Sequence, residues 1–546
     1  MSKLLVGFLN PKYKFTNWSY LIWWWIPIWS AFFIEVSTNQ FESYRFLNLI
    51  ENHFFAIICL IAALLLKPMV FKQRLKHVFF SLFVFFTFAE TLYFCWFSTN
   101  FSASSIFVLF ETNVAEASEF LSFYINPFSI IYASLTLAYI AIYWIFQTKN
   151  KVELKPVLST FGLIICLIIS LFFIRITKLI DQNFPYLVVR GVHVYQEEQE
   201  ALANLHIDKP KGSFTNVTSA SKQPRTFVLI IGESTTKHNL ELYGYPRPTN
   251  PKLSKRKEQL HVFEDVISTN AFTIGALKTA LSLHNFEAKN ESTIVQLFNQ
   301  ADFETHWISN QRPIGPYESI VTKISRASNF YTFTNTALAG KKTPIDEVLL
   351  PYLKTTLKRN TKDKFIVLHI LGTHLQYKDR YPSRFEKFNN EAPNLKYVHA
   401  EAIQKRNEYD NAVLYNDFLI DEVIKQVEQE NGESYVLYFA DHGEEVFLNQ
   451  DFAGHNDDNP SPSMFEVPFI LWTNKNFQKS FQNTIDTSRA YSLNNFIHSL
   501  AELSAIQFDE FEPEKSIFSK DFKIESRFIK QKIDFKSFKS SFEKEN

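Results

Sequence analysis

The sequence predicts two folds in one chain: an N-terminal bundle of about five transmembrane helices, followed by an α/β domain built on a largely parallel sheet. Apolar runs of membrane-spanning length follow one another as far as residue 176 and then stop. From residue 225 onward, short buried strands alternate with helices. A chain of 546 residues is also too long for one ordinary core. We therefore expect a transmembrane domain at 1–176, a bridging helix and linker at 177–224, and a second folded domain at 225–546.

The first third contains five segments with the roughly 20 apolar residues that a helix needs to cross a bilayer. A cleaved signal peptide is the alternative for the first of them, but four more spans follow and no small-residue cleavage site is evident. The predicted spans are Trp18–Val36, Phe46–Leu66, Val78–Phe97, Pro127–Phe146 and Val157–Ile176.

Lysine and arginine predict the orientation of these spans. They gather before the first span and in the loops after the second and fourth, whereas the loops at 37–45 and 98–126 together hold only Arg45. Because Lys-rich and Arg-rich loops stay in the cytoplasm, the N-terminus is expected to be cytoplasmic. An odd number of spans then places everything after Ile176 outside the membrane.

Composition argues against a nucleic-acid-binding protein and against a disulfide-stapled second domain. The formal net charge is zero, which gives no support for nucleic-acid binding, where a basic excess is usual. The three cysteines, Cys59, Cys95 and Cys166, all lie in apolar runs of the first third. The second domain is therefore not stapled by disulfides, even if it is exported.

Six runs in the second domain are predicted strands, and Tyr409–Asn431 is a predicted amphipathic helix. Three of the strands end in polar residues. Glu233 follows the first, His374 comes shortly after the fourth, and Asp441 and His442 follow the fifth. Carboxyl ends of parallel strands share one sheet edge, and this mix of oxygen and imidazole ligands suits zinc. The predicted strands are 227–231, 261–267, 303–309, 366–371, 435–440 and 467–472.

A hydroxyl nucleophile would complete such a zinc site. The segment Ser268–Ser282 follows a strand and opens a helix, whose N-terminal N–H groups can hold a phosphate. Thr269, Thr273 and Thr279 compete for the role, and spacing does not choose among them. His374 and His455 could hold a second metal, or bind and protonate a phosphoryl oxygen.

Four motifs in this domain resemble those of phosphoethanolamine transferases, inner-membrane enzymes of the alkaline phosphatase and sulfatase superfamily. They are IGESTTKHNLELYGYPRPTNP at 231–251, LGTHLQYKDRYPSRF at 371–385, EYDNAVLYND at 408–417 and ADHGEEV at 440–446. The layout of five spans followed by a periplasmic catalytic domain is similar as well. Several motifs in register make the resemblance specific.

The resemblance implies roles for individual residues. It implies one tightly bound zinc, leaving a second open, with Thr273 as both nucleophile and ligand. His374 and His455 match histidines around the phosphoryl site, and Thr112 and Glu116 match residues that contact the ethanolamine phosphate. An Asn of the family is here Val108, and a downstream Lys of the family has Lys323 as its nearest counterpart. The implied zinc ligands are Glu233, Thr273, Asp441 and His442.

The implied reaction moves phosphoethanolamine from phosphatidylethanolamine to lipopolysaccharide through a covalent phospho-threonine. Members that modify lipid A carry disulfides in this domain, and their absence here favours a core heptose or Kdo sugar as the acceptor. The alternatives are transfer to lipid A or to another periplasmic glycan, a lipoteichoic-acid-type glycerol-phosphate transferase, and a membrane sensor that retains the fold.

Overall fold

The computed structural model divides the chain into two compact units, Met1–Leu109 with Tyr124–Glu198, and Phe110–Phe123 with Gln199–Asn546. The predicted boundaries at 176 and 224 stay predictions. The structure describes residues 17–38, 44–65, 69–101, 105–106, 109–110, 114–150, 159–203, 206–219, 221, 223–283, 292–312, 320–335, 343–390, 393 and 395–545.

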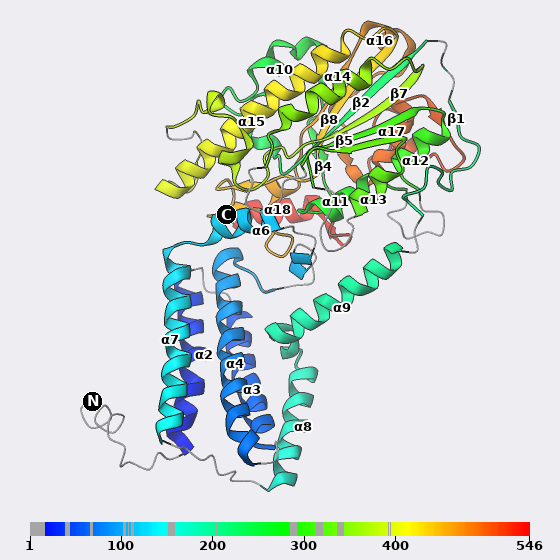
Figure 1. Ribbon diagram of the computed structural model, residues 1–546. Coiled ribbons are helices and arrows are strands. Elements are labelled where there is room, and N and C mark those ends of the chain that lie inside the picture. The colour runs from blue at the N-terminus through cyan, green and yellow to red at the C-terminus, as the bar shows by residue number, and fades with distance from the viewer. Residues whose placement is uncertain are drawn as a thin grey trace. The chain divides into compact units, whose positions relative to one another are not determined.

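Helices form the first unit (Figure 1). Each of the five predicted spans coincides with a helix over its described residues; residue 66 of the second span and residues 157–158 of the fifth lie outside the described part. Within that part, three stretches are long and apolar enough to cross a membrane, Arg45–Leu65, Leu75–Phe97 and Pro127–Gln147. Two apolar stretches, Leu21–Ser37 and Thr160–Ile176, are shorter. The helices are α2 (Asn17–Thr38), α3 (Tyr44–Leu65), α4 (Met69–Phe97), α7 (Pro127–Asn150), α8 (Thr160–Ile176) and α9 (Phe184–Ala203).

Buried polar side chains connect α2, α3 and α4. The Arg45 guanidinium lies 2.9 Å from Glu35, and both side chains are at most 2% exposed. Glu90 accepts hydrogen bonds from Asn48 and Asn52 at 2.5 and 3.3 Å. Because water does not reach such groups in a bilayer, each must find its partner inside the bundle. Glu90, an acid within a predicted span, therefore joins two helices.

The second unit is built on a seven-stranded mixed sheet in the order β3-β11-β8-β2-β7-β5-β6. The block β8-β2-β7-β5-β6 is parallel throughout, and β11 pairs antiparallel with both β8 and β3. The predicted largely parallel sheet is confirmed. The strands are β2 (Arg225–Gly232), β3 (Leu260–Val262), β5 (Glu304–Ser309), β6 (Phe330–Phe333), β7 (Asp363–His369), β8 (Glu433–Ala440) and β11 (Phe469–Thr473).

Helices cover both faces of this sheet (Figure 1). On one face lie α14 (Leu350–Leu357) and α15 (Ala400–Val427), the helix predicted at Tyr409–Asn431. On the other lie α12 (Ile294–Gln300), α13 (Ile320–Arg326) and α17 (Phe496–Leu503). Strand β2 is buried along its whole length because both faces are covered. Its apolar run therefore reads as continuous rather than alternating.

Two strand predictions were incomplete. The run 261–267 is two strands, because its second half, β4 (Asp265–Ile267), leaves the sheet to pair with β12 (Ala490–Ser492). Strand β6 at the sheet edge was not predicted. Its side chains are exposed or half-buried, so it lacks the buried apolar run that marks the other strands.

The C-terminal tail is an ordered part of this unit. It forms a hairpin of β14 (Phe528–Ile529) and β15 (Ile533–Asp534), followed by α18 (Phe535–Glu545). Lys539 of α18 contacts the buried Glu466 at 2.8 Å, as do His238 at 2.6 Å and Lys237 at 3.4 Å. Burial alone would raise the pKa of Glu466, but these positive neighbours outweigh it and hold that pKa below its ordinary value.

Candidate metal centre and nucleophile

Two neighbouring strands deliver three of the four predicted metal ligands to one edge. Gly232 pairs with Ala440 at the ends of β2 and β8, so the residues that follow meet in space. Glu233, Asp441 and His442 are each at most 1% exposed. One ligand atom from each lies within 4.8 Å of the others. The structure thus brings together the Glu, Asp and His that the strand ends predicted.

The backbone around Glu233 is held in sparsely populated conformations. Ser234 has φ +53°, although it is not glycine, and its amide donates to Asp441 Oδ1 at 3.1 Å. Gly372, at φ +54°, packs so closely that a Cβ there would lie 2.8 Å from the backbone N and O of Glu233. Only glycine allows this approach, which carries the chain from β7 toward His374. Such strain is retained where the surrounding structure overdetermines it, as at functional sites.

The hydroxyl of Thr273 is the one that reaches the predicted metal site. Thr273 is the first residue of α11 (Thr273–Ala280), and its Oγ1 lies 3.1 and 3.2 Å from the two carboxylate oxygens of Glu233. The competing hydroxyls point elsewhere, since Thr269 contacts the Asn270 side chain and Thr279 donates to the Gly275 carbonyl. The geometry therefore selects Thr273 among the three threonines that sequence spacing did not distinguish.

The electrostatics of the three ligands fit a cation. Burial and the nearby charge of Glu233 raise the pKa of Asp441 well above its ordinary value, because two carboxylates converge here. Burial would lower the pKa of His442, yet the charge of Asp441 and the contact with Glu233 raise it to about 10. Asp441 Oδ2 and His442 Nε2 face each other at 3.5 Å, and among the described residues neither atom makes a hydrogen bond of ordinary geometry.

The orientation of the His442 ring is also set for metal binding. Its Nδ1 lies 2.8 Å from the Gly443 carbonyl and donates to it, so Nε2 is the nitrogen that faces Glu233 at 3.2 Å. A carbonyl that holds the other imidazole nitrogen is the usual support of a metal-bound histidine. A divalent cation would replace the proton on Nε2 and relieve the repulsion between the carboxylates. The residues present thus fit zinc.

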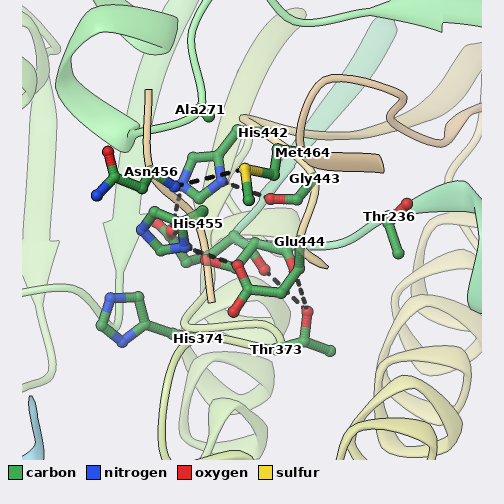
Figure 2. A network of polar contacts seen from close by, with 12 residues as sticks. Thr236, Ala271, Thr373, His374, His442, Gly443, Glu444, His455, Asn456 and Met464 are labelled. Atoms are coloured by element: carbon green, nitrogen blue, oxygen red, sulfur yellow. Dashed lines mark hydrogen bonds and ion pairs between the residues drawn. The ribbon is translucent and has the colours of Figure 1, made fainter. Parts of the chain in front are cut away.

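A second group adjoins the first (Figure 2). The rings of His442 and His455 are 4.3 Å apart, and His455 Nδ1 lies 2.6 Å from the buried Glu444. Tyr377 donates its hydroxyl to the other Glu444 oxygen at 2.6 Å. His442, Glu444 and His455 form a second set with metal-ligand spacing. Sequence reasoning missed Glu444, although it lies two residues beyond His442 in the same short run.

Two further side chains approach Glu233. His374 is close enough to help lower the pKa of Glu233, which burial alone would raise and which His442 lowers most. Figure 2 shows His374 in the same group as His455. Gln311, two residues past the end of β5, donates to Glu233 Oε2 at 3.2 Å. Apart from its position after a strand, nothing in the sequence marks Gln311 as a site residue.

The predicted contacts to ethanolamine phosphate lie outside what the structure describes. This holds for Thr112 and for the side chain of Glu116, although Glu116 belongs to α6 (Val114–Tyr124). The end of α6 contacts the segment after His374. Ser122 accepts a hydrogen bond from Gln376 at 2.5 Å, and the Phe123 and Tyr377 rings are 5.8 Å apart.

Known proteins match this chain in sequence and in fold. The sulfatase family model matches residues 225–506, just over half of the chain. Phosphoethanolamine transferase EptC of Escherichia coli is 30% identical over 475 residues, covering 81% of this chain and 82% of that protein. The chain belongs to the phosphoethanolamine transferase family. The family member CptA of Salmonella typhimurium matches to the same extent, at 30% identity over 475 residues.

Solved structures extend the comparison. The zinc complex of the C-terminal periplasmic domain of Escherichia coli EptC superposes with a TM-score of 0.57 at 32% identity, covering 59% of this transferase and 96% of that chain. The integral membrane EptA of Neisseria meningitidis superposes with a TM-score of 0.67 and covers 91% of this chain and 98% of its own. At 21% identity it shows a common fold. The transferase therefore shares the layout of a helical N-terminal region with a sulfatase-like domain.

Proposed function

We propose that this transferase moves phosphoethanolamine from phosphatidylethanolamine to a lipopolysaccharide or lipooligosaccharide, with a core heptose or Kdo sugar as the favoured acceptor. Relatives named for phosphoethanolamine transfer support the reaction, and EptA of Neisseria meningitidis is named for lipooligosaccharide. One observation carries the mechanism: the Thr273 hydroxyl lies within 3.2 Å of Glu233, beside the buried Asp441 and His442.

Glu233, Asp441, His442 and Thr273 are the residues that would hold zinc. When bound, zinc supplies the positive charge that lowers the pKa of the threonine hydroxyl and neutralises phosphoryl oxygens. The solved zinc complex of Escherichia coli EptC, at 32% identity, supports this choice of metal. Glu444 and His455 are the residues around which a second ion would bind.

The transfer proceeds as a double displacement. Thr273 Oγ1 releases its proton to a solvent water and forms a bond to phosphorus, while the bond from phosphorus to the diacylglycerol oxygen breaks. His374 or His455 gives a proton to that leaving oxygen. Helix α11 begins at Thr273, so its first backbone N–H groups are available to hold phosphoryl oxygens.

The second displacement reverses the roles. A sugar hydroxyl attacks the same phosphorus and its proton passes to the histidine. The bond to Thr273 Oγ1 breaks, and Thr273 takes a proton back from solvent. Both substrates are lipids or lipid-anchored, which is why the catalytic domain needs a membrane tether. We place the N-terminus in the cytoplasm and the catalytic domain in the periplasm of a bacterial inner membrane, and we assign Thr112 and Glu116 to the ethanolamine phosphate.

Mass spectrometry of lipopolysaccharide tests this function. Core oligosaccharide and lipid A are compared from cells that lack the protein and from the same cells complemented with the wild type or with Thr273→Ala. We expect one phosphoethanolamine on the core sugars in wild-type cells alone. The same addition on lipid A would overturn the acceptor, and a glycerol-phosphate addition would favour the lipoteichoic-acid-type alternative. The absence of any addition would favour a membrane sensor.

A further inference from the structure

A buried carboxylate joins the two loops that carry Thr273 and His455. Asp457 is 6% exposed and lies two residues after His455. Its Oδ1 accepts the backbone N–H of Ala271 at 2.7 Å, and its Oδ2 accepts the side-chain amide of Asn270 at 3.1 Å. Asn270 and Ala271 belong to the short turn that leads into Thr273. The contact therefore spans the site from the histidine side to the nucleophile side.

The C-terminal hairpin forms hydrogen bonds with both loops. The backbone N–H of Lys530 donates to the Thr269 carbonyl at 2.8 Å, and its ammonium group donates to the Asp457 carbonyl. Lys530 and Gln531 both have positive φ, +52° and +63°. Side chains other than glycine adopt this conformation at a cost, so it persists where contacts overdetermine it. Here the tight turn between β14 and β15 sets both residues in this conformation, and Lys530 of that turn contacts the two loops.

Packing fixes the hairpin in this place. Ile529 and Phe535 are buried in one cluster with Ile267, Ala271, Met464 and Phe465. Arg527 forms two hydrogen bonds to Asp265 of β4, at 2.7 and 2.9 Å. The cluster includes Ala271 of the nucleophile turn and Met464, whose sulfur accepts the Asn456 N–H. The C-terminal tail thus contacts the loops that carry Thr273 and His455 both through its buried apolar side chains and through Lys530.

We propose that Asp457, with Asn270 and Lys530, forms a clamp that positions Thr273 against the phosphoryl group. These are positioning residues, because they act through the backbone of residues 269–271 and do not reach the reacting atoms. The inference rests on the proposed function. A displacement of a nucleophile by about 1 Å can cost about 100-fold in rate, so a clamp on this turn acts mainly on kcat.

An exchange of the two hydrogen-bonding groups tests the clamp. Asn270→Asp sets two carboxylates against each other at the position of the present hydrogen bond. Adding Asp457→Asn restores the bond with its polarity reversed and still leaves an oxygen for the Ala271 N–H. We expect the single variant to lose about 100-fold in kcat, with KM unchanged, and the double variant to recover most of it. Full-length protein in detergent micelles is assayed with fluorescent phosphatidylethanolamine and purified lipopolysaccharide.

Three measurements make the result decisive. The rate is expressed per zinc-loaded molecule, so that loss of fold or of metal does not imitate a positioning effect. Lys530→Met, which keeps the backbone N–H but removes the ammonium group, should lower kcat as well, and the exposed Lys532→Met in the same turn should not. An unchanged kcat in Asn270→Asp, or a double variant no better than the single, would overturn the clamp.

Amide exchange separates this inference from the proposed function. If wild-type protein releases no diacylglycerol from phosphatidylethanolamine, the proposed function fails. Hydrogen exchange of the peptide around 268–276 then still tests the clamp. We expect faster exchange in Asn270→Asp and recovery in the double variant, and equal exchange in all three proteins would refute it.

Discussion

Replacement of Glu233 by Gln tests the metal centre most directly. The two carboxylate oxygens of Glu233 accept hydrogen bonds from Thr273, from Ser234 at 2.9 Å and from Gln311, and they face His442 Nε2. A glutamine amide turns one of these acceptors into a donor that meets other donors. It also removes the negative charge that zinc needs. We therefore expect Glu233→Gln to lose zinc binding.

The size of the effect follows from linkage. A ligand at about 100 times its Kd that binds only the folded protein stabilises it by about 2.7 kcal/mol. For a domain of the size of 225–546, each kcal/mol raises Tm by about 2 °C, so zinc should raise the wild-type Tm by about 5 °C. Glu233→Gln should show no rise over its own metal-free form.

Thermal unfolding of the full-length protein in detergent, with and without zinc, measures both values. Thr273→Ala is the matched control, because Glu233, Asp441 and His442 remain. We expect it to keep most of the zinc-dependent rise while transfer of phosphoethanolamine falls to the level of a blank. A full rise in Glu233→Gln would refute the ligand assignment, and normal transfer by Thr273→Ala would refute the nucleophile.

Three further predictions concern residues around the site and in the bundle. Tyr377→Phe leaves a buried Glu444 oxygen without its donor, so the free energy of unfolding should fall by about 1–2 kcal/mol and transfer should slow; an unchanged Tm and rate would contradict this contact. Because the pKa of Glu466 is lowered from its ordinary value of 4.5, the carboxylate contributes stability above pH 4.5, and this stability is lost as pH falls below 4.5. Glu466→Gln should therefore flatten the decline in Tm below pH 4.5. An unaltered dependence of Tm on acid pH would exclude this linkage. Arg45→Met leaves Glu35 buried without its cation, which should destabilise the bundle by about 3 kcal/mol and lower the folded yield in size-exclusion chromatography; wild-type yield and Tm would argue against the pair.

The fold could be predicted because its signals are local. A helix that crosses a bilayer needs a long apolar run, and a strand buried on both faces needs a short one, and both are visible along the chain. The strand ends then placed Glu233 and Asp441 with His442 at one edge, since neighbouring parallel strands end together. Strand β6 escaped this reasoning because its side chains are exposed or half-buried.

The sequence by itself therefore determined the two-part architecture, the edge at which the site lies and three of its candidate ligands. The family resemblance had already selected Thr273 among the three threonines. Only the tertiary structure showed that its hydroxyl faces Glu233, that Glu444 pairs with His455, and that Asp457 reaches across to Ala271, 186 residues earlier. Apolar periodicity is set by the solvent that each segment meets, so it can be read locally. Hydrogen bonds between distant loops depend on how the whole domain packs, and local patterns carry no record of them.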